Sequence, residues 1–403
     1  MELRSSIEFY DNRFLMFVLD QMAYEFEKNG SKEVIRMTLG KSELPLHEDI
    51  IQSMKDALDT FEKSSLVFPP GLPELKEALA EEYKKTYDLD INPNNILINV
   101  GTSALFRNLF YLLAKEGDEV LLPRPYYSLY HFCAQLVGAN VRYYDINLET
   151  LALDLDSFRE NFTDKTKIVV INSPGNPLGN ILTKEELYAI DEIIDGQAVV
   201  INDEIYANVC FDERSTSVLE LTDTKSAFIT TNAFSKGYRM YSRRVGYCIV
   251  PDELVTPLTV IQHHTLLTAD PVVQFGALEA LAHPEEIEQL VSLYRARRDY
   301  TVERFNEVPL VRAIPAQGSF YFTLDCEKYM DEHGIETSLE LAEQIMRAKQ
   351  VATVPGSDFG LPKMLRLSYS TTRYNEGIDR LVDFFTNSLV GQSAGSAAIP
   401  VQE

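Results

Sequence analysis

The sequence contains no tryptophan and only four cysteines, and it has fewer basic than acidic side chains. The cysteines stand far apart and form no CxxC pair: Cys133, Cys210, Cys248 and Cys326. This spacing indicates neither a disulfide framework nor a zinc site. With 37 basic against 61 acidic side chains, the formal net charge is −24, which argues against binding to nucleic acid or to an anionic membrane surface. That charge still allows a local basic pocket for a small anion.

Long apolar runs are absent as well. No stretch approaches the roughly 20 apolar residues that a helix needs to span a bilayer, and the opening MELRSSIEFYDNRF lacks the apolar core of a signal peptide. The adjacent His263 and His264 have no carboxylate or cysteine partner at ligand spacing, so we expect no metal site. These absences favour a soluble, cytoplasmic protein.

The composition is that of a globular protein, with 403 residues of which 45% are hydrophobic. Two amphipathic helices are predicted at Ile50–Glu62 and Leu72–Tyr87, and short apolar runs then alternate with helical stretches over residues 96–250. Continuous valine and isoleucine runs such as Lys167–Ile171 and Ala198–Ile201 are typical of strands that are buried on both faces. The alternation therefore predicts a doubly wound α/β core.

This alternation ends after Asp252, and one long charged helix is predicted at Glu285–Asn306. Strands at Gly318–Leu324 and Met364–Ser370 alternate with two further helices, which predicts a smaller α+β unit. The expected organisation is an N-terminal arm that joins the small domain (1–48), a large domain (49–290), a small C-terminal domain (291–390) and a disordered tail (391–403).

Five polar motifs follow or interrupt the apolar runs. They are Val100–Ser103, Asn172–Gly179, Asp203–Tyr206, Asn232–Lys236 with Arg244, and Leu365–Tyr369, which contains Arg366. Ligands of open α/β sheets bind at the carboxyl ends of the strands, where the first four motifs are predicted to lie. Each motif alone has an ordinary alternative, namely a turn with a helix cap, a polar loop or a lysine on the solvated surface.

Three of the motifs contain groups that need, or suit, a particular kind of binding partner. Backbone N–H groups at a helix start after Gly101, together with two hydroxyls, suit a phosphate. Asp203 follows a buried strand and needs a cationic or hydrogen-bonding partner, because an unpaired buried carboxylate is costly. Arg366 stands inside an apolar strand, where an anion is the natural partner.

Together and in this order, the motifs NSPGNPLG, DEIY, FSK with RRVGY, and RLSYS resemble those of the class I and II aminotransferases, fold-type I enzymes that use pyridoxal 5′-phosphate. The segments GLPELKEALAEEY and GDEVLLPRPYYSLY are similar to that family too, so the resemblance runs from about Gly40 to about Leu389. It implies an α/β fold with a large mixed, mostly parallel seven-stranded sheet domain and a smaller α+β domain.

The resemblance also implies cofactor roles. Lys236 matches the lysine that forms a Schiff base with the cofactor and then moves the substrate Cα proton. Asp203 matches the acid that pairs with the pyridinium nitrogen and keeps it protonated. Tyr206 and Asn176 match the two donors to the phenolic oxygen, and Tyr127 matches the aromatic side chain that stacks on the ring.

Other positions match contacts to the phosphate and to the substrate. The implied phosphate contacts are Thr102, Ser103 and Arg244, with Gly101 allowing a close approach. Arg366 matches the arginine that clamps the substrate α-carboxylate, and Gly40 and Asn176 match residues that line the same site. Tyr10 is a further aromatic candidate.

The chain departs from the family pattern at two phosphate contacts. Ala233 stands where many relatives have a serine, and Leu66 stands where many have a tyrosine that the partner subunit supplies. Ser235 is the residue that would compensate for Ala233.

The segment Gln262–Gln274 corresponds to a stretch that crosses the dimer interface in the family, so the resemblance implies a homodimer. In aspartate aminotransferases an arginine there selects the dicarboxylic side chain, and Asp270 falls at its place. Asp270 would repel a second substrate carboxylate, or it simply caps the helix that begins at Pro271; both interpretations stay open.

We therefore expect an aminotransferase that moves an amino group to a 2-oxo acid from an L-amino acid, with neutral, aromatic or cationic donors favoured over dicarboxylic ones. A pyridoxal phosphate-dependent lyase, cyclase or oxidase of the same fold is the alternative, since it would keep Lys236, Asp203 and Arg366. A catalytically inactive binding domain is disfavoured because Lys236 and Asp203 are both present. The expected partners are amino and 2-oxo acids and a second copy of the chain, with no nucleic acid and no membrane.

Overall fold

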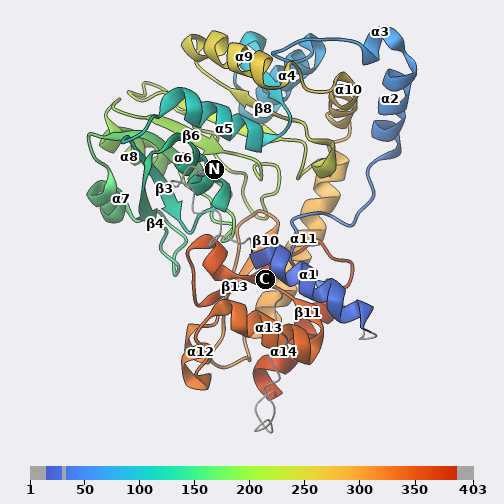
Figure 1. Cartoon of the computed structure of the whole chain (residues 1–403), viewed down its shortest axis with the longest axis vertical. Coiled ribbons are helices and arrows are strands. Elements are labelled where there is room, and N and C mark those ends of the chain that lie inside the picture. Colours follow the sequence, from blue (N-terminus) through green and yellow to red (C-terminus); the bar gives the residue numbers. More distant parts are fainter. Residues whose placement is uncertain (1–14, 30–32, 388–403) are drawn as a thin grey trace, which may run out of the picture.

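The structure is a computed structural model that describes residues 15–29 and 33–387. Its largest element is a seven-stranded sheet with the strand order β2-β8-β7-β6-β5-β3-β4, in the upper half of the molecule in Figure 1. The strands are β2 (Ile96–Asn99), β3 (Glu119–Arg124), β4 (Asn140–Asp145), β5 (Thr166–Asn172), β6 (Val199–Asp203), β7 (Phe228–Ala233) and β8 (Gly246–Ile249). Both pairings of β8 are antiparallel and the other four are parallel, so the prediction of a mixed, mostly parallel sheet is confirmed.

Strand β5 shows why its sequence is continuously apolar. Ile168 and Val170 pack on one face of the sheet with α5 and α6, whereas Val169 and Ile171 pack on the other face with α7 and α8. Successive side chains of a strand point to opposite faces, so a strand covered on both sides has no polar face. The helices of this half are α2 (Glu48–Asp59), α3 (Phe61–Ser64), α4 (Pro73–Tyr87), α5 (Thr102–Leu113), α6 (Ser128–Val137), α7 (Leu155–Asn161), α8 (Lys184–Ile194), α9 (Asp252–Leu266) and α10 (Pro271–Ala280).

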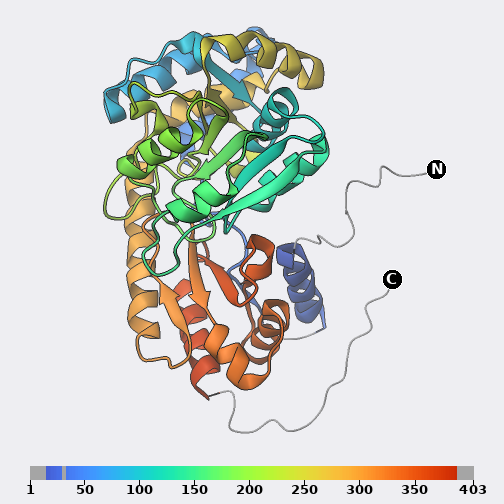
Figure 2. The same cartoon turned by 90° about the vertical axis from the view of Figure 1, so that its left-hand side faces the viewer.

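Helix α11 (Glu285–Phe305) runs from this half into the lower half, along the left flank of the molecule in Figure 2. The lower half contains an antiparallel sheet of order β12-β13-β10-β9 and a parallel pair of β1 and β11. Its strands are β1 (Ile35–Arg36), β9 (Arg312–Ile314), β10 (Tyr321–Asp325), β11 (Val351–Ala352), β12 (Val354–Pro355) and β13 (Met364–Ser368). Its helices are α1 (Leu15–Lys28), α12 (Glu327–His333), α13 (Ser338–Lys349) and α14 (Tyr374–Asn387).

The N-terminal segment crosses this lower half and continues towards the large sheet. After the β1–β11 pairing, Met37 donates its N–H to the carbonyl of Ala352 (2.8 Å) and accepts the N–H of Ser368 (2.9 Å). The hydroxyls of Ser368 and Ser370 both donate to the carbonyl of Leu39, at 2.7 Å each. These bonds fix the residue that follows, Gly40.

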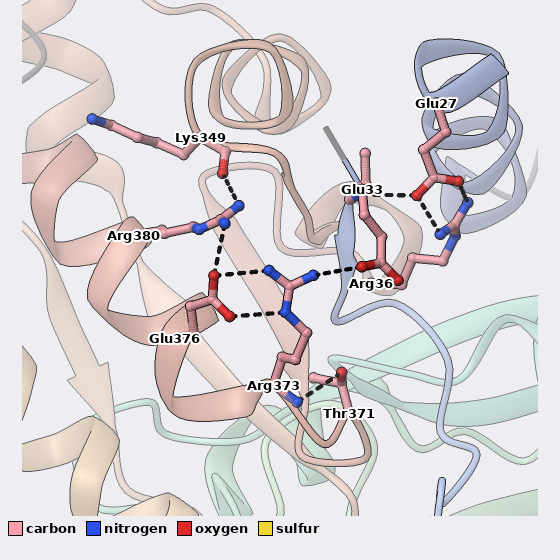
Figure 3. Close-up of polar contacts among 9 residues, drawn as sticks. Glu27, Glu33, Arg36, Lys349, Thr371, Arg373, Glu376 and Arg380 are labelled. Carbon is pink, nitrogen blue, oxygen red and sulfur yellow. Dashed lines mark hydrogen bonds and ion pairs between the residues drawn. The ribbon is translucent and has the colours of Figure 1, made fainter. Parts of the chain in front are cut away.

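Ion pairs tie the same segment to α1 and α14 (Figure 3). Arg36 donates two hydrogen bonds to the carboxylate of Glu27, at 2.9 and 2.8 Å. Arg373 bridges Glu33 (3.1 Å) and Glu376 (2.8 Å), so it joins the segment to the start of α14. Each pair is partly exposed and adds little stability alone, but together they restrict where the segment can lie.

The structure corrects the predicted elements in several places. Thr60 is extended (φ −104°, ψ 107°) and divides the helix predicted at Ile50–Glu62 into α2 and α3. The strand predicted from Gly318 begins only at Tyr321, because Ser319 has a left-handed φ of 72°. The sequence pattern also does not predict α9, which contains the helix breaker Pro257.

No helix in residues 15–29 and 33–387 combines the length and the apolar composition that crossing a bilayer requires. The predicted tail at 391–403 and Tyr10 lie outside the described residues. The predicted domain boundaries stay a prediction.

Glu204 directly follows β6 and is buried, and only one of its two carboxylate oxygens accepts hydrogen bonds from the described residues. Its Oε1 accepts from Ser217 Oγ (2.8 Å), Val218 N (3.2 Å) and two further donors, whereas Oε2 has no hydrogen-bond partner among the described residues. Burial outweighs these hydrogen bonds and raises the pKa of Glu204 from 4.5 to about 7.

We predict that Glu204→Gln flattens the pH dependence of stability. The folded state binds more protons at Glu204 than the unfolded state does, so the stabilisation present below about pH 4.5 is lost as the pH rises to about 7. This loss amounts to up to about 3 kcal/mol for wild type. Urea midpoints measured across that range test it, with Glu192→Gln on the exposed surface of α8 as the control. Equal slopes for wild type and Glu204→Gln would contradict the prediction.

Candidate active site

A cavity of about 260 Å³ lies where the carboxyl ends of the large sheet's strands meet the N-terminal segment and the small sheet. Nearly all residues that the sequence predicts for the site line this cavity. They are Gly40, Thr102, Ser103, Tyr127, Asn176, Asp203, Tyr206, Ser235, Lys236, Arg244 and Arg366. Gly101 lies beside it, next to Arg244. Five motifs that are far apart in the sequence therefore meet in one place.

Lys236 enters the cavity three residues after the end of β7. Its Nζ donates to the carbonyl of Gly40 at 2.8 Å and lies 5.5 and 5.3 Å from the ring centres of Tyr206 and Phe320. A Cβ at position 40 would stand only 2.8 Å from Nζ and would clash with Tyr321 Oη. Glycine is thus required there for the close approach of backbone and amine.

Asp203 ends β6 and points into the same cavity. Its Oδ2 accepts from the hydroxyl of Tyr130 (2.7 Å), and its Oδ1 accepts from Ile205 N (3.3 Å) and Thr231 Oγ1 (3.4 Å). Burial raises the pKa of Asp203 to about 6, although the three hydrogen bonds and the charge of Lys236 act to lower it. A cationic N–H in the cavity would stabilise the carboxylate, so Asp203 suits a protonated ring nitrogen.

Arg366 comes from β13 in the small sheet and is buried (3% exposed). It donates to the side-chain oxygen of Asn176 at 3.2 Å and to the carbonyl of Thr38 at 2.6 Å. The rings of Tyr321 and Phe359 lie 4.0 and 4.7 Å from the guanidinium carbon. The side chain is thus fixed by contacts from four different segments.

The other end of the cavity has the donors that a phosphate requires. Helix α5 begins at Thr102, and Gly101 before it has a φ of 86°, which favours glycine. A Cβ on Gly101 would clash with Arg244 Nη2, so the arginine passes directly over the helix start. Arg244 also donates to the carbonyl of Tyr241 at 2.9 Å. The hydroxyls of Thr102 and Ser103 complete a donor set that fits the phosphate of the implied cofactor.

The sequence did not indicate several residues that line the cavity, namely Leu39, Tyr130, Tyr241 and Tyr321. Asn172 and Ile205, which belong to two of the predicted motifs, and Lys41 line the cavity as well. Tyr130 lies one helical turn after Tyr127 and Tyr321 lies between two core phenylalanines, so both have the sequence pattern of core residues. Only the pairing of their hydroxyls with Asp203 and Tyr206 distinguishes them.

The structure also shows where the residues that depart from the family pattern lie. Asp270 is exposed and its Oδ1 accepts the N–H of Val272 at 2.9 Å, so the interpretation as a cap of α10 is confirmed. It does not line the cavity of its own chain. Ala233 is buried within β7, whereas Ser235 lines the cavity; its compensating role stays a prediction.

The described residues contain one cluster of potential metal ligands, and it does not include the adjacent His263 and His264. Among the described residues, His47, Asp49 and His283 bring their ligand atoms within 4.8 Å of one another. His283 is engaged by Glu285 (3.0 Å) and Glu279 (3.3 Å), and His47 caps α2. These ion pairs and the cap account for the cluster, which shares no residue with the cavity.

Comparison with known proteins agrees with this geometry. The family model described as aminotransferase class I and II matches residues 32–385. The probable aspartate/prephenate aminotransferase of Aquifex aeolicus is 34% identical over 77% of this chain and 81% of its own length. The aspartate aminotransferase of Bacillus sp. (strain YM-2) is 28% identical over 87% and 91%.

Among solved structures, the aspartate aminotransferase from Thermus thermophilus with maleate superposes with a TM-score of 0.86 at 26% identity. That match covers 95% of this chain and 99% of the other. The aspartate aminotransferase from Thermotoga maritima gives a TM-score of 0.82 at 28% identity over 92% and 96%.

We predict that Lys236→Ala abolishes covalent attachment of pyridoxal 5′-phosphate. Lys236 supplies the cavity with an amine, and an amine is what a Schiff base requires. Borohydride reduction followed by peptide mass spectrometry measures the attachment, and the visible absorbance of the purified yellow protein reports it independently. Lys41→Ala, which removes a neighbouring amine at the same cavity, is the control and should keep both signals. Cofactor still attached covalently in Lys236→Ala would contradict the assignment.

Proposed function

The chain belongs to the class I and II aminotransferases, which are pyridoxal phosphate-dependent enzymes, and from this premise we propose its substrates and the roles of its residues. The proposed reaction moves the amino group of a neutral, aromatic or cationic L-amino acid to a 2-oxo acid. One observation carries the proposal: Lys236, Asp203 and Arg366, from three different strands or strand ends, line one cavity.

The bound cofactor supplies an electron sink that acidifies the substrate Cα–H. In our proposal Lys236 Nζ removes that proton, because this amine lines the cavity and is held there by its hydrogen bond to the carbonyl of Gly40. Asp203 holds a proton on the ring nitrogen, and the hydroxyl of Tyr130 orients the carboxylate at 2.7 Å. Tyr206 and Asn176 are the proposed donors to the phenolic oxygen.

Arg366 is the proposed binding site for the substrate α-carboxylate. A guanidinium can hold both carboxylate oxygens at once, and desolvation strengthens such a pair. Its contacts with Asn176 and Thr38 fix the fork before the substrate arrives, so little conformational entropy remains to be lost on binding.

The proposed preference among side chains rests on the charges around the cavity. Its cationic lining residues, within the described part of the chain, are Lys41, Lys236, Arg244 and Arg366. The last three have proposed roles at the proton, the phosphate and the α-carboxylate. Lys41 is exposed, and its Nζ lies 5.1 Å from the ring centre of Tyr241. A second substrate carboxylate therefore has no dedicated buried partner among residues 15–29 and 33–387 of this chain.

Aspartate as the main donor is the competing proposal, favoured by the names of the relatives. It would require Lys41 or a residue of a second subunit to bind the distal carboxylate. The other alternative, a lyase, cyclase or oxidase, would use the same Lys236, Asp203 and Arg366, so only the products separate it from an aminotransferase.

We predict that kcat/KM with the monocarboxylic acceptor 2-oxobutyrate is higher for alanine, phenylalanine or arginine than for aspartate. The physical reason is the missing partner for a second carboxylate, because an uncompensated buried charge weakens binding. Stopped assays analysed by mass spectrometry give both the rate and the product. Aspartate leading by tenfold or more would overturn the preference and leave the transfer intact. Ammonia or hydrogen peroxide formed without a new amino acid would overturn the transfer itself.

The homodimer is also a proposal, and an exposed apolar surface supports it. The loop before Gly71 and the end of α9 lie side by side, because Thr268 Oγ1 donates to the carbonyl of Phe68 at 2.8 Å and Gln262 Nε2 donates to that of Pro69. The large apolar side chains exposed around these elements are Leu58, Phe61, Val67, Phe68 and Leu267. Apolar side chains exposed on adjoining segments, such as Phe68 and Leu267, support a subunit interface in this region.

We predict that light scattering gives twice the chain mass for wild type and a lower mass for the double variant Phe61→Ser/Leu267→Ser. These side chains are 77% and 45% exposed in the single chain, so a polar replacement costs nothing in the core but weakens an apolar interface. Tyr24→Ser on α1, where 58% of the residue is exposed, is the control. A wild-type protein that is monomeric and active at micromolar concentration would contradict the dimer.

A further inference from the structure

Tyr321 contacts two of the cations that line the cavity, Lys236 and Arg366. It opens β10, pairs in register with Ser368 of β13 and is 4% exposed. Its ring centre lies 5.9 Å from Lys236 Nζ and 4.0 Å from the guanidinium carbon of Arg366. No other side chain among the described residues makes ring contacts of this kind with both cations.

The Tyr321 hydroxyl occupies the space that Gly40 leaves open. A Cβ on Gly40 would clash with Tyr321 Oη and stand 2.8 Å from Lys236 Nζ, so the hydroxyl and the amine border the same gap. Tyr206 donates its hydroxyl hydrogen to Tyr321 Oη at 3.3 Å. Tyr321 can therefore still donate its own hydroxyl hydrogen, and accept one more hydrogen bond, on the side that faces Lys236.

We propose that Tyr321 is a positioning residue whose hydroxyl orients the amine of Lys236 and whose ring holds the guanidinium of Arg366. This inference rests on the proposed function, because it assigns Lys236 to proton transfer and Arg366 to the α-carboxylate. The two parts act through different atoms of one side chain, so they can be separated by substitution.

The charge environment supports a hydroxyl that interacts with the amine. Burial acts to raise the pKa of the Tyr321 phenol, but the positive charges of Lys236 and Arg366 and the hydrogen bond from Tyr206 outweigh it and lower this pKa. The other titratable groups facing it are Tyr127 and Tyr294, whose pKa values burial raises. Tyr321 therefore differs from its neighbours in having a lowered pKa, and its phenolate form would accept a charge-assisted hydrogen bond from a protonated nitrogen.

The ring contributes by restricting the plane of Arg366. The guanidinium lies between Tyr321 and Phe359, with the second ring centre at 4.7 Å. A planar cation between two aromatic faces is attracted by both and can rotate little. The nitrogens that bind Asn176 and Thr38 are held by the same arrangement, so the orientation offered to a carboxylate is set before binding.

The test compares Tyr321→Phe, which keeps the ring, with Tyr321→Leu, which removes the ring and the hydroxyl. Tyr329→Phe is the matched control, since Tyr329 is a buried tyrosine of the same core cluster that does not line the cavity. For Tyr321→Phe we expect kcat to fall about tenfold with KM changed less than about twofold, as for the loss of one hydrogen bond. For Tyr321→Leu we expect a further rise of about tenfold in the KM of the amino acid donor.

Two measurements do not depend on turnover. The pH at which the cofactor's visible absorbance is halfway through its change should be lower in both holoenzyme variants than in wild type. Each variant lacks the Tyr321 oxygen, which would accept a hydrogen bond from a protonated nitrogen beside Lys236. In the full chain without cofactor, ultraviolet titration should lose one phenolate that forms in wild type at a lower pH than an ordinary tyrosine does. The Tyr329→Phe control should leave both readouts unchanged.

An unchanged midpoint and kcat in Tyr321→Phe would overturn the role of the hydroxyl. A KM in Tyr321→Leu equal to that of Tyr321→Phe would overturn the role of the ring. If Tyr321→Leu does not fold, Phe359→Leu removes the second ring over Arg366 and should raise KM in the same way; an unchanged KM would again overturn the ring's role. Failure of the proposed function would appear separately, as wild-type enzyme that transfers no amino group to any 2-oxo acid.

Discussion

Burial of the large sheet on both faces is the constraint on which the site depends. Strands β5, β6 and β7 are covered on both faces, so any polar side chain within them needs a hydrogen-bonding partner. Because these three strands are parallel, their carboxyl ends meet at one edge. Asn172 and Asp203 end two of them, and Lys236 follows the third. The cavity is thus a consequence of the sheet's topology.

The opposite wall of the cavity comes from distant parts of the chain. Gly40 arrives with the N-terminal segment, whereas Tyr321 and Arg366 stand on neighbouring strands of the small sheet. The hydrogen bonds between Met37 and both Ala352 and Ser368, and the ion pairs around Arg373, hold that segment against the small sheet. Any movement of the small sheet relative to the large one therefore changes the spacing between Lys236 and Arg366.

Two adjacent carboxylates show how the end of one strand serves both structure and site. Asp203 lines the cavity and accepts a hydrogen bond from Tyr130, whereas Glu204 does not line it and binds Ser217 and Val218. Burial raises the pKa of both, to about 6 and about 7. Asp203 is set to receive a cationic partner, and Glu204 makes folding depend on pH without facing the cavity.

The sequence by itself predicted the mostly parallel core from its apolar runs, and the resemblance of its short motifs predicted many of the residues that meet in the cavity, because runs and motifs are local properties of the chain. It indicated Lys236, Asp203 and Arg366 through short motifs next to predicted strands, and the structure brings them together. Only the tertiary structure decided the residues that connect these groups. Tyr321 and Tyr130 have the pattern of core residues, and the break of the helix at Thr60 has no local apolar signature. Their roles come from contacts between segments tens to hundreds of residues apart, which no local pattern encodes.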